Sequence, residues 1–281
     1  MILVTGATGN VGSEVVRALV ARGAPVRALA RVPERAALPP SVEVVPGDLD
    51  RPDTLGQALA DVRKAFLLGG FTALPDVLAR LRASGAMQVV LLTSRCVVGG
   101  DRGNAITRMW LDAEVAVRAS GIPWTIVRPS GFHANALRWL PQLRDGDVVR
   151  APWPDVPIAS IDPADIAEVA ATALTEPAHE SAALSLSGPE PLTPGEQVAT
   201  LADVLRRPLR FEPLADDEAR AAMAADTPAD VIDALFRFFS GGEFDDSPVV
   251  DTVQRITGRL PRTFEQWAAA HAHRFSVGAD A

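Results

Sequence analysis

The stretch MILVTGATGNVG at residues 1–12 decides the fold of this chain. Met1–Val4 is a short apolar run without charge, which predicts a buried strand. From Ser13 the apolar residues recur at helical spacing until Gly23, which predicts a helix. Between the strand and the helix, glycines recur at every third position, at Gly6, Gly9 and Gly12.

Each glycine of this turn has a separate physical role. The first permits a tight turn, the second lets backbone N–H groups approach a pyrophosphate, and the third lets the helix pack close to the strand. The positive end of the helix then faces the phosphates. We therefore expect a dinucleotide to bind across the turn, at Gly6, Thr8, Gly9, Asn10, Val11 and Gly12.

The end of the second expected strand, Val26–Ala30, bears on which dinucleotide binds. An acidic residue about 20 positions after the glycines would hold the ribose diol of NAD. None is present, and Arg31 follows the strand instead. A guanidinium can pair bidentately with the 2′-phosphate of NADP. NADP is therefore favoured over NAD, the alternative being that Arg31 is only a solvated side chain.

Further apolar runs alternate with helical segments, as in a parallel sheet covered by helices. The expected strands are 42–45, 65–68, 88–92, 124–127 and 183–186, which makes about seven in all. From about Thr193 helices dominate, with one short strand at 209–212. We predict a doubly wound, Rossmann-like α/β domain at 1–190 and a smaller, mainly helical region at 191–281 that packs on it and covers the substrate.

Residues after the other expected strands complete the cofactor site, because ligands gather at the carboxyl ends of parallel strands. Asp48 could accept a hydrogen bond from the adenine amino group while Leu49 packs against the ring. Gly69 and Gly70 leave room for a ribose. We also assign cofactor contacts to the residues that end the fifth and sixth strands, Thr93, Ser94 and Pro129.

Composition excludes several other classes of protein. The net charge of −8, without a basic stripe, argues against direct binding of nucleic acid. No apolar run approaches 18 residues and no leader precedes the glycine motif, so we expect a cytoplasmic protein without a membrane segment. The single cysteine, Cys96, allows no internal disulfide. The histidines are dispersed, and no metal site is expected.

Six segments together resemble the atypical short-chain dehydrogenases/reductases, and within them the NmrA-like branch. They are TGATGNVG at 5–12, LAR at 29–31, GDLDRPDTL at 47–55, VVLLTS at 89–94, SGIPWTIVRPSGF at 120–132 and IDPADIAEVAATAL at 161–174. The resemblance implies a Rossmann-like sheet, an NAD(P) site across the strand ends and a small C-terminal region over the substrate. It does not fix the reaction.

The chain departs from that family at the catalytic residues. Short-chain dehydrogenases normally use a serine, a tyrosine and a lysine, the tyrosine acting as general acid. This chain contains no tyrosine. Matching the segments places Arg95 at the serine position, Ile106 at the tyrosine position and Trp110 at the lysine position. The usual carbonyl chemistry of the family is therefore not expected here.

Two uses of NADPH remain, and we favour an enzyme. In the first, hydride passes to a quinone-like or conjugated carbonyl compound that needs little acid catalysis, because the cofactor carries the chemistry and the protein orients it. In the second, a non-catalytic NmrA-like regulator senses NADP(H) and acts through a protein partner. An isomerase or epimerase that uses the cofactor transiently is a third hypothesis.

The substrate side is expected to be aromatic, which suits a flat, apolar molecule. The candidates for this pocket are Phe71, Trp110, Phe132, Trp139 and Phe236, although tryptophans on helices, such as Trp110 and Trp139, are more often core residues. His133 is the candidate proton donor, the alternative being a structural histidine. Arg95 could stabilise an oxyanion or form a salt bridge. We expect a monomer or a homodimer.

Overall fold

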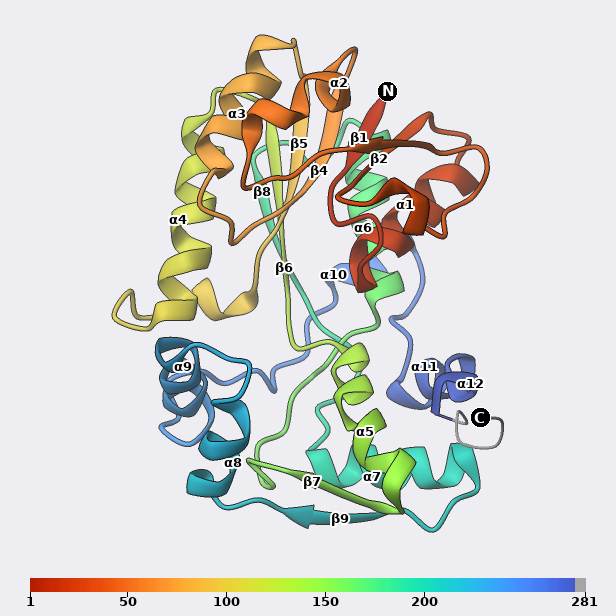
Figure 1. Ribbon diagram of the computed structural model, residues 1–281, viewed down its shortest axis with the longest axis vertical. Coiled ribbons are helices and arrows are strands. Elements are labelled where there is room, and N and C mark those ends of the chain that lie inside the picture. The colour runs from red at the N-terminus through yellow and green to blue at the C-terminus, as the bar shows by residue number, and fades with distance from the viewer. Residues whose placement is uncertain (276–281) are drawn as a thin grey trace.

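The computed structural model describes residues 1–275, and its larger part is a parallel sheet of seven strands in the order β3-β2-β1-β4-β5-β6-β8 (Figure 1). Each neighbouring pair of strands is parallel. The predicted Rossmann-like fold is confirmed. The strands are β1 (Ile2–Val4), β2 (Val26–Ala30), β3 (Glu43–Pro46), β4 (Lys64–Leu68), β5 (Gln88–Leu92), β6 (Trp124–Pro129) and β8 (Ala182–Leu186).

Helices cover both faces of this sheet, which explains why its central strands are nearly continuous apolar runs. On one face α1 (Asn10–Ala21) and α6 (Pro163–Thr175) lie side by side over a core that contains Val15 and Ile166. The other face carries α2, α3 and α4 over a leucine-rich core. These helices are α2 (Gly56–Leu59), α3 (Leu74–Ala83) and α4 (Ala105–Ala119), with short 3₁₀ turns η1 (Pro33–Arg35), η2 (Pro52–Leu55) and η3 (Arg95–Val97).

A smaller lobe lies beyond the carboxyl ends of the strands (Figure 1). It has its own apolar core around Phe264 and Trp267. The expected strand near 209–212 is β9 (Arg210–Pro213), and it pairs in parallel with β7 (Val148–Ala151), which we did not predict. The helical elements of the lobe are η4 (His133–Trp139), α5 (Leu140–Asp145), α7 (Pro194–Leu205), α8 (Asp216–Met223), α9 (Ala229–Phe239), α11 (Phe264–Ala270) and α12 (Ala272–Phe275).

The segment 244–250 leads from α9 back to the sheet. The backbone N–H of Ala159 donates to the carbonyl oxygen of Asp246 at 2.8 Å. The backbone N–H of Val250 donates to the hydroxyl of Ser187, just after β8, at 2.9 Å. The chain then forms α10 (Thr252–Thr257), which packs against α6. This crossing segment therefore passes over the carboxyl ends of the last strands.

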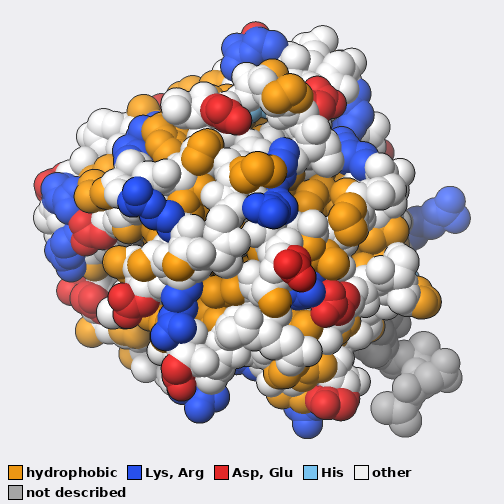
Figure 2. Space-filling view, turned by 90° about the horizontal axis from the view of Figure 1, so that it is seen from above, with side chains coloured by type: hydrophobic (Ala, Val, Ile, Leu, Met, Phe, Trp, Pro, Cys, Tyr) orange, Lys and Arg blue, Asp and Glu red, His pale blue; other side chains and the backbone are white. Residues whose placement is uncertain are grey.

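The surface carries no large field of one sign on the face drawn in Figure 2, where basic and acidic side chains are scattered among apolar and neutral ones. In the described part of the chain, no helix combines the length and the apolar character that crossing a membrane requires.

Candidate functional site

The glycine turn between β1 and α1 has the geometry of an anion cradle. Gly6 has φ +60°, and its carbonyl oxygen accepts the N–H of Gly9 at 2.9 Å. A Cβ on Gly12 would lie 2.0 Å from the same oxygen, so only glycine allows this approach of helix to turn. Thr8, Gly9 and Asn10 are exposed at the start of α1, whereas Val11 is buried. The residues present therefore fit a pyrophosphate.

Thr5 holds the start of this turn to the neighbouring strand. Its side chain is buried; the hydroxyl donates to the carbonyl oxygen of Phe66 at 3.1 Å and accepts the N–H of Leu68 at 3.0 Å. These bonds join the carboxyl ends of β1 and β4, between which the strand order reverses. Such a reversal point is where open α/β sheets bind ligands. We did not select Thr5 from the sequence, although it opens the glycine motif.

The structure brings Arg31 and Asp48 together. Both line one pocket of about 270 Å³ at the ends of β2 and β3, together with Arg51 and Thr54. Asp48 Oδ1 accepts the N–H of Asp50 at 3.1 Å, and its Oδ2 lies 3.6 Å from Arg51 Nε. Leu49 is half-buried against the leucine-rich core. The pocket thus offers two guanidinium groups, one of which the sequence pattern did not single out.

Gly69 and Gly70 follow β4 and lie against α4. A Cβ on Gly69 would come within 2.9 Å of the Trp110 ring, and one on Gly70 within 3.2 Å of the sulfur of Met109. Phe71 lies beside them and lines a pocket of about 280 Å³ with Gly70 and Met109. Trp110 and Phe71 are therefore grouped near the end of β4.

Thr93 and Ser94, at the end of β5, are already engaged within the protein. The Thr93 hydroxyl donates to Glu114 at 3.2 Å, and the Ser94 hydroxyl accepts the N–H of Cys96 at 3.3 Å. Glu114 is buried and accepts two bonds from Arg128, at 2.7 and 2.5 Å. Burial acts to raise the pKa of Glu114, but Arg128, Arg118 and Thr93 outweigh it and leave that pKa below its ordinary value.

Arg95 follows Ser94 and is buried against the crossing segment. Its Nη1 donates to the carbonyl oxygen of Pro248 at 2.9 Å and lies 3.5 Å from Asp246 Oδ1. Asp246 Oδ2 accepts the N–H of Gly131, two residues after Pro129, at 2.8 Å. Burial raises the pKa of Asp246 to about 7, against the opposing effects of the Gly131 N–H and the charge of Arg95. Arg95 therefore has the salt-bridge partner that the sequence left as an alternative.

His133 lies in the core of the smaller lobe. Its Nε2 donates to the carbonyl oxygen of Arg262 at 3.3 Å, and its Nδ1 lies 2.9 Å from the hydroxyl of Ser160. Its ring meets Phe264 edge to face (ring centroids 5.4 Å apart). Burial lowers the pKa of His133 to about 4, against the effects of the Arg262 carbonyl and the charge of Asp165. A neutral ring with both nitrogens bonded favours a structural role.

The other aromatic candidates are not all in one place. Phe132 forms a bridge with Ile161, next to His133, and is half-buried between the sheet and the smaller lobe. Trp139 packs into the core of that lobe. Phe236 is buried against Trp153 and Ile232. Its neighbour Phe238 instead packs in one cluster with Cys96, Val97 and Trp110.

The one lysine and the one cysteine of the sequence are not placed to act as catalytic groups at these strand ends. The one lysine of the sequence, Lys64, lies at the amino end of β4 and donates to the carbonyl oxygen of Leu174 at 2.6 Å. Cys96 is buried, and burial raises the pKa of its thiol. Within residues 1–275, no group of three or more His, Cys, Asp or Glu residues could hold a metal ion.

Comparison with known families and proteins agrees with this geometry. The family described as NAD(P)H-binding matches residues 6–177. The (4-alkanoyl-5-oxo-2,5-dihydrofuran-3-yl)methyl phosphate reductase of Streptomyces griseus is 45% identical over 284 residues, which cover 98% of this chain and 99% of that protein. The NAD(P)H azoreductase of Xenophilus azovorans is 34% identical over 290 residues, covering 99% and 100%.

Solved structures show the same fold along nearly all of the described residues. The triphenylmethane reductase of Citrobacter sp., complexed with NADP(H), superposes with a TM-score of 0.79 at 25% identity and covers 96% of this chain and 99% of its own. The negative transcriptional regulator NmrA, in complex with NAD, superposes with a TM-score of 0.75 at 17% identity, covering 99% and 98%. The fold expected from the resemblance to NmrA-like proteins is therefore confirmed, and an enzyme and a regulator share it.

Proposed function

The chain belongs to the NAD(P)H-binding family, and from this premise we propose that it is an NADPH-dependent reductase acting on a conjugated carbonyl or quinone-like small molecule without a Ser-Tyr-Lys triad. The observation that carries the proposal is the glycine cradle at the start of α1, where Gly12 fits against Gly6 only because it lacks a side chain. The 45% identity over the full length of a reductase supports the same class of reaction.

The preference for NADPH rests on the pocket at the ends of β2 and β3. Arg31 is exposed there, and Arg51 lines the same pocket. A 2′-phosphate at this place would meet guanidinium donors, which bind phosphate in a fork geometry that neutral side chains cannot supply. Asp48 in the same pocket would accept a hydrogen bond from the adenine amino group.

The acceptor is proposed by analogy with the Streptomyces griseus reductase, which is 45% identical to this chain. That relative reduces an alkanoyl-substituted 5-oxo-2,5-dihydrofuran that carries a phosphorylated hydroxymethyl group. A ring of this kind holds a carbon–carbon double bond conjugated with carbonyl groups. When bound, reduced nicotinamide supplies a hydride, and conjugation lets the carbonyl oxygens take up the resulting negative charge. Such an acceptor needs less help from a protein acid than an isolated ketone.

The chain's own residues would shape the acceptor site around the end of β4. Phe71 and Trp110 lie beside Gly69 and Gly70, and Phe132 follows β6. Their rings would exclude water and hold a flat acceptor. Arg95 would place positive charge near the developing oxyanion if it exchanged its bond to Pro248 for one to the acceptor. Trp139 and Phe236 pack in two other clusters of the smaller lobe and are not part of this wall.

A non-catalytic NADP(H) sensor is the second candidate, and one observation favours it. Trp110 lies close against Gly69, and the crossing segment lies over Arg95 and Gly131. With the nicotinamide at these strand ends, as the proposal has it, these contacts would partly fill the space beside its ring. A sensor tolerates such filling, whereas an enzyme must admit an acceptor.

Turnover distinguishes the two candidates. The protein is mixed with NADPH and a panel containing the alkanoyl-furanone phosphate, its dephosphorylated form, quinones and simple ketones, and loss of the reduced nicotinamide absorbance is followed. The proposal predicts oxidation well above the protein-free rate with conjugated acceptors and little with ketones. Tight NADPH binding without oxidation by any acceptor would favour the sensor.

A further inference from the structure

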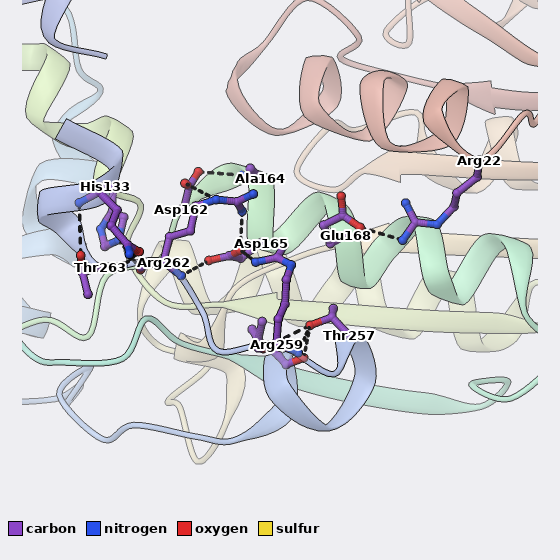
Figure 3. Close-up of polar contacts among 12 residues, drawn as sticks. Arg22, His133, Asp162, Ala164, Asp165, Glu168, Thr257, Arg259, Arg262 and Thr263 are labelled. Atoms are coloured by element: carbon purple, nitrogen blue, oxygen red, sulfur yellow. Dashed lines mark hydrogen bonds and ion pairs between the residues drawn. The ribbon is translucent and has the colours of Figure 1, made fainter. Parts of the chain in front are cut away.

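A second cleft, of about 790 Å³, lies between the two parts of the molecule and outside the Arg31 pocket. Its walls come from the exposed side of α1, from the start of α6 and from α11 and α12. Figure 3 shows several of its charged residues, with Arg259 and Arg262 meeting Asp165 at the start of α6.

Two arginines are held rigidly in this cleft by a carboxylate behind them. Asp165 is fully buried, and its Oδ1 accepts from Arg259 Nη1 at 2.7 Å and from Arg262 Nη1 at 2.6 Å. Its Oδ2 accepts the backbone N–H of Arg262 at 2.6 Å. Charge-assisted bonds of this kind fix the guanidinium planes. The two arginines are therefore arranged before any ligand arrives.

The anchored arginines still have donors to offer. Arg259 Nη2 is buried and has no hydrogen-bond partner among residues 1–275. The side chains of Arg259 and Arg262 are nevertheless 36% and 40% exposed, so their outer N–H groups can meet a ligand oxygen. Arg274 lines the same cleft and forms no ion pair with any described residue. Arg17 and His273 add further basic groups to its rim.

Part of the cleft is apolar, since Ala134, Leu137, Trp267 and Ala270 line it. Glu14 and Asp162 also line it and pair with Arg17 and Arg262. A ligand that matches both walls has an anionic head and an apolar chain. A phosphate suits the head best, because its several oxygens can meet guanidinium donors that come from different directions.

We propose that this cleft binds a phosphate monoester with a short apolar chain, the phosphate lying against Arg259 and Arg274 and the chain lying along Leu137 and Trp267. The site borders the glycine cradle at Asn10 but lies outside the Arg31 pocket, and it does not depend on the proposed reductase activity. The ligand could be a phosphorylated acceptor or another phosphate monoester, and the experiment below distinguishes these two sources.

The test uses Gln266→Glu, which adds a negative charge to the cleft with little effect on the fold. Gln266 lines the cleft, and its side chain accepts the N–H of Thr263 in a capping box that glutamate forms equally well. Gln254→Glu, on the exposed side of α10, makes the same change of net charge outside the cleft. Arg274→Ala removes a positive charge from the rim.

The probe is hexyl phosphate, titrated calorimetrically at constant ionic strength, with and without saturating NADP⁺. We expect wild type and Gln254→Glu to bind it equally, and Gln266→Glu and Arg274→Ala to bind it about three- to tenfold more weakly. The proposal is overturned if all four proteins bind alike, if wild type does not bind, if hexanol binds as well, or if NADP⁺ displaces the probe, which would place it in the cradle.

A competition arm identifies the source of the ligand. If the alkanoyl-furanone phosphate displaces hexyl phosphate, the acceptor itself occupies the cleft; if only other phosphate monoesters do so, the ligand is a separate molecule. Either result leaves the phosphate site in place.

Discussion

Gly12 and Gly6 meet so closely that the carbonyl oxygen of Gly6 occupies the space that a side chain on Gly12 would need. A Cβ there would lie 2.0 Å from that oxygen and 2.5 Å from the carbonyl carbon. Both atoms are backbone, so neither can yield without moving the turn. The start of α1 and the phosphate-binding turn are thus one rigid unit.

Gly12→Ala should therefore damage the cradle. We expect the helix to be pushed from the turn, NADPH to bind at least about tenfold more weakly, and the free energy of unfolding to fall by about 1 to 3 kcal/mol. Fluorescence titration and urea unfolding measure the two effects. Gly56→Ala is the matched control, because its φ of −52° and the open space around it accommodate a methyl group. Unchanged NADPH affinity in Gly12→Ala would refute the assignment of the turn.

Arg31→Asp tests the cofactor preference. The new carboxylate would repel a 2′-phosphate in the pocket that Arg31 lines. The affinity for NADPH should therefore fall by about tenfold or more, while the affinity for NADH should fall little. Arg35→Asp is the control, since Arg35 does not line that pocket. Equal loss for the two nucleotides would remove the reason for proposing NADPH.

His133→Phe tests whether this histidine is structural. The variant keeps an aromatic ring beside Phe264 but loses the bonds to Ser160 and Arg262, so we expect a loss of about 1 to 3 kcal/mol in unfolding free energy. Turnover per folded molecule should change little, with His179→Asn as a control outside this cluster. A large fall in turnover without loss of stability would make His133 catalytic.

The same histidine predicts a pH dependence of stability. Its pKa in the folded protein is about 4, below the ordinary 6.5, so the unfolded chain binds the proton more readily. The contribution of the neutral His133 ring to the free energy of unfolding is complete above pH 6.5 and is lost as the pH falls toward 4. In His133→Phe this loss should be absent, as urea unfolding at several pH values would reveal.

Asp246 predicts the opposite dependence of the free energy of unfolding on pH. Its pKa in the folded protein is about 7, above the ordinary 3.8, so the folded protein holds the proton and stability falls as the pH rises between these values. Asp246→Asn should remove this slope and stabilise the protein by about 2 to 4 kcal/mol near pH 8. Asp245→Asn changes an exposed neighbour, so it should neither remove this pH dependence nor stabilise the protein to that extent. A variant that is less stable than wild type near pH 8 would contradict this expectation.

The sequence predicted most of the features that depend on residues close together in the chain, such as a strand and the residues that follow it. Arg31 and Asp48 follow adjacent parallel strands, whose carboxyl ends share one edge, and they do line one pocket. The strand β7 was missed because its partner, β9, lies far along the chain and the run is only four residues. Asp246 was missed for a similar reason, since nothing in its local sequence indicates that it lies against Gly131.

The aromatic candidates illustrate a different limit. An aromatic residue after a strand or on a helix indicates burial but not the direction in which it is buried. Phe236 and Phe238 are two positions apart on α9, and only Phe238 shares a cluster with Trp110. Trp139 likewise packs into the separate core of the smaller lobe, whose existence depends on long-range pairing.

Transfer of isotope from the cofactor tests the account most directly. The protein is incubated with NADPH deuterated at C4 of the nicotinamide and with the alkanoyl-furanone phosphate, and the product is analysed by mass spectrometry and NMR. The account predicts one deuterium bound to carbon in the reduced ring, from one face of the nicotinamide, and much slower incorporation in the Gly12→Ala control at the same subsaturating NADPH concentration. Binding of NADPH with no deuterium in any conjugated acceptor would contradict it.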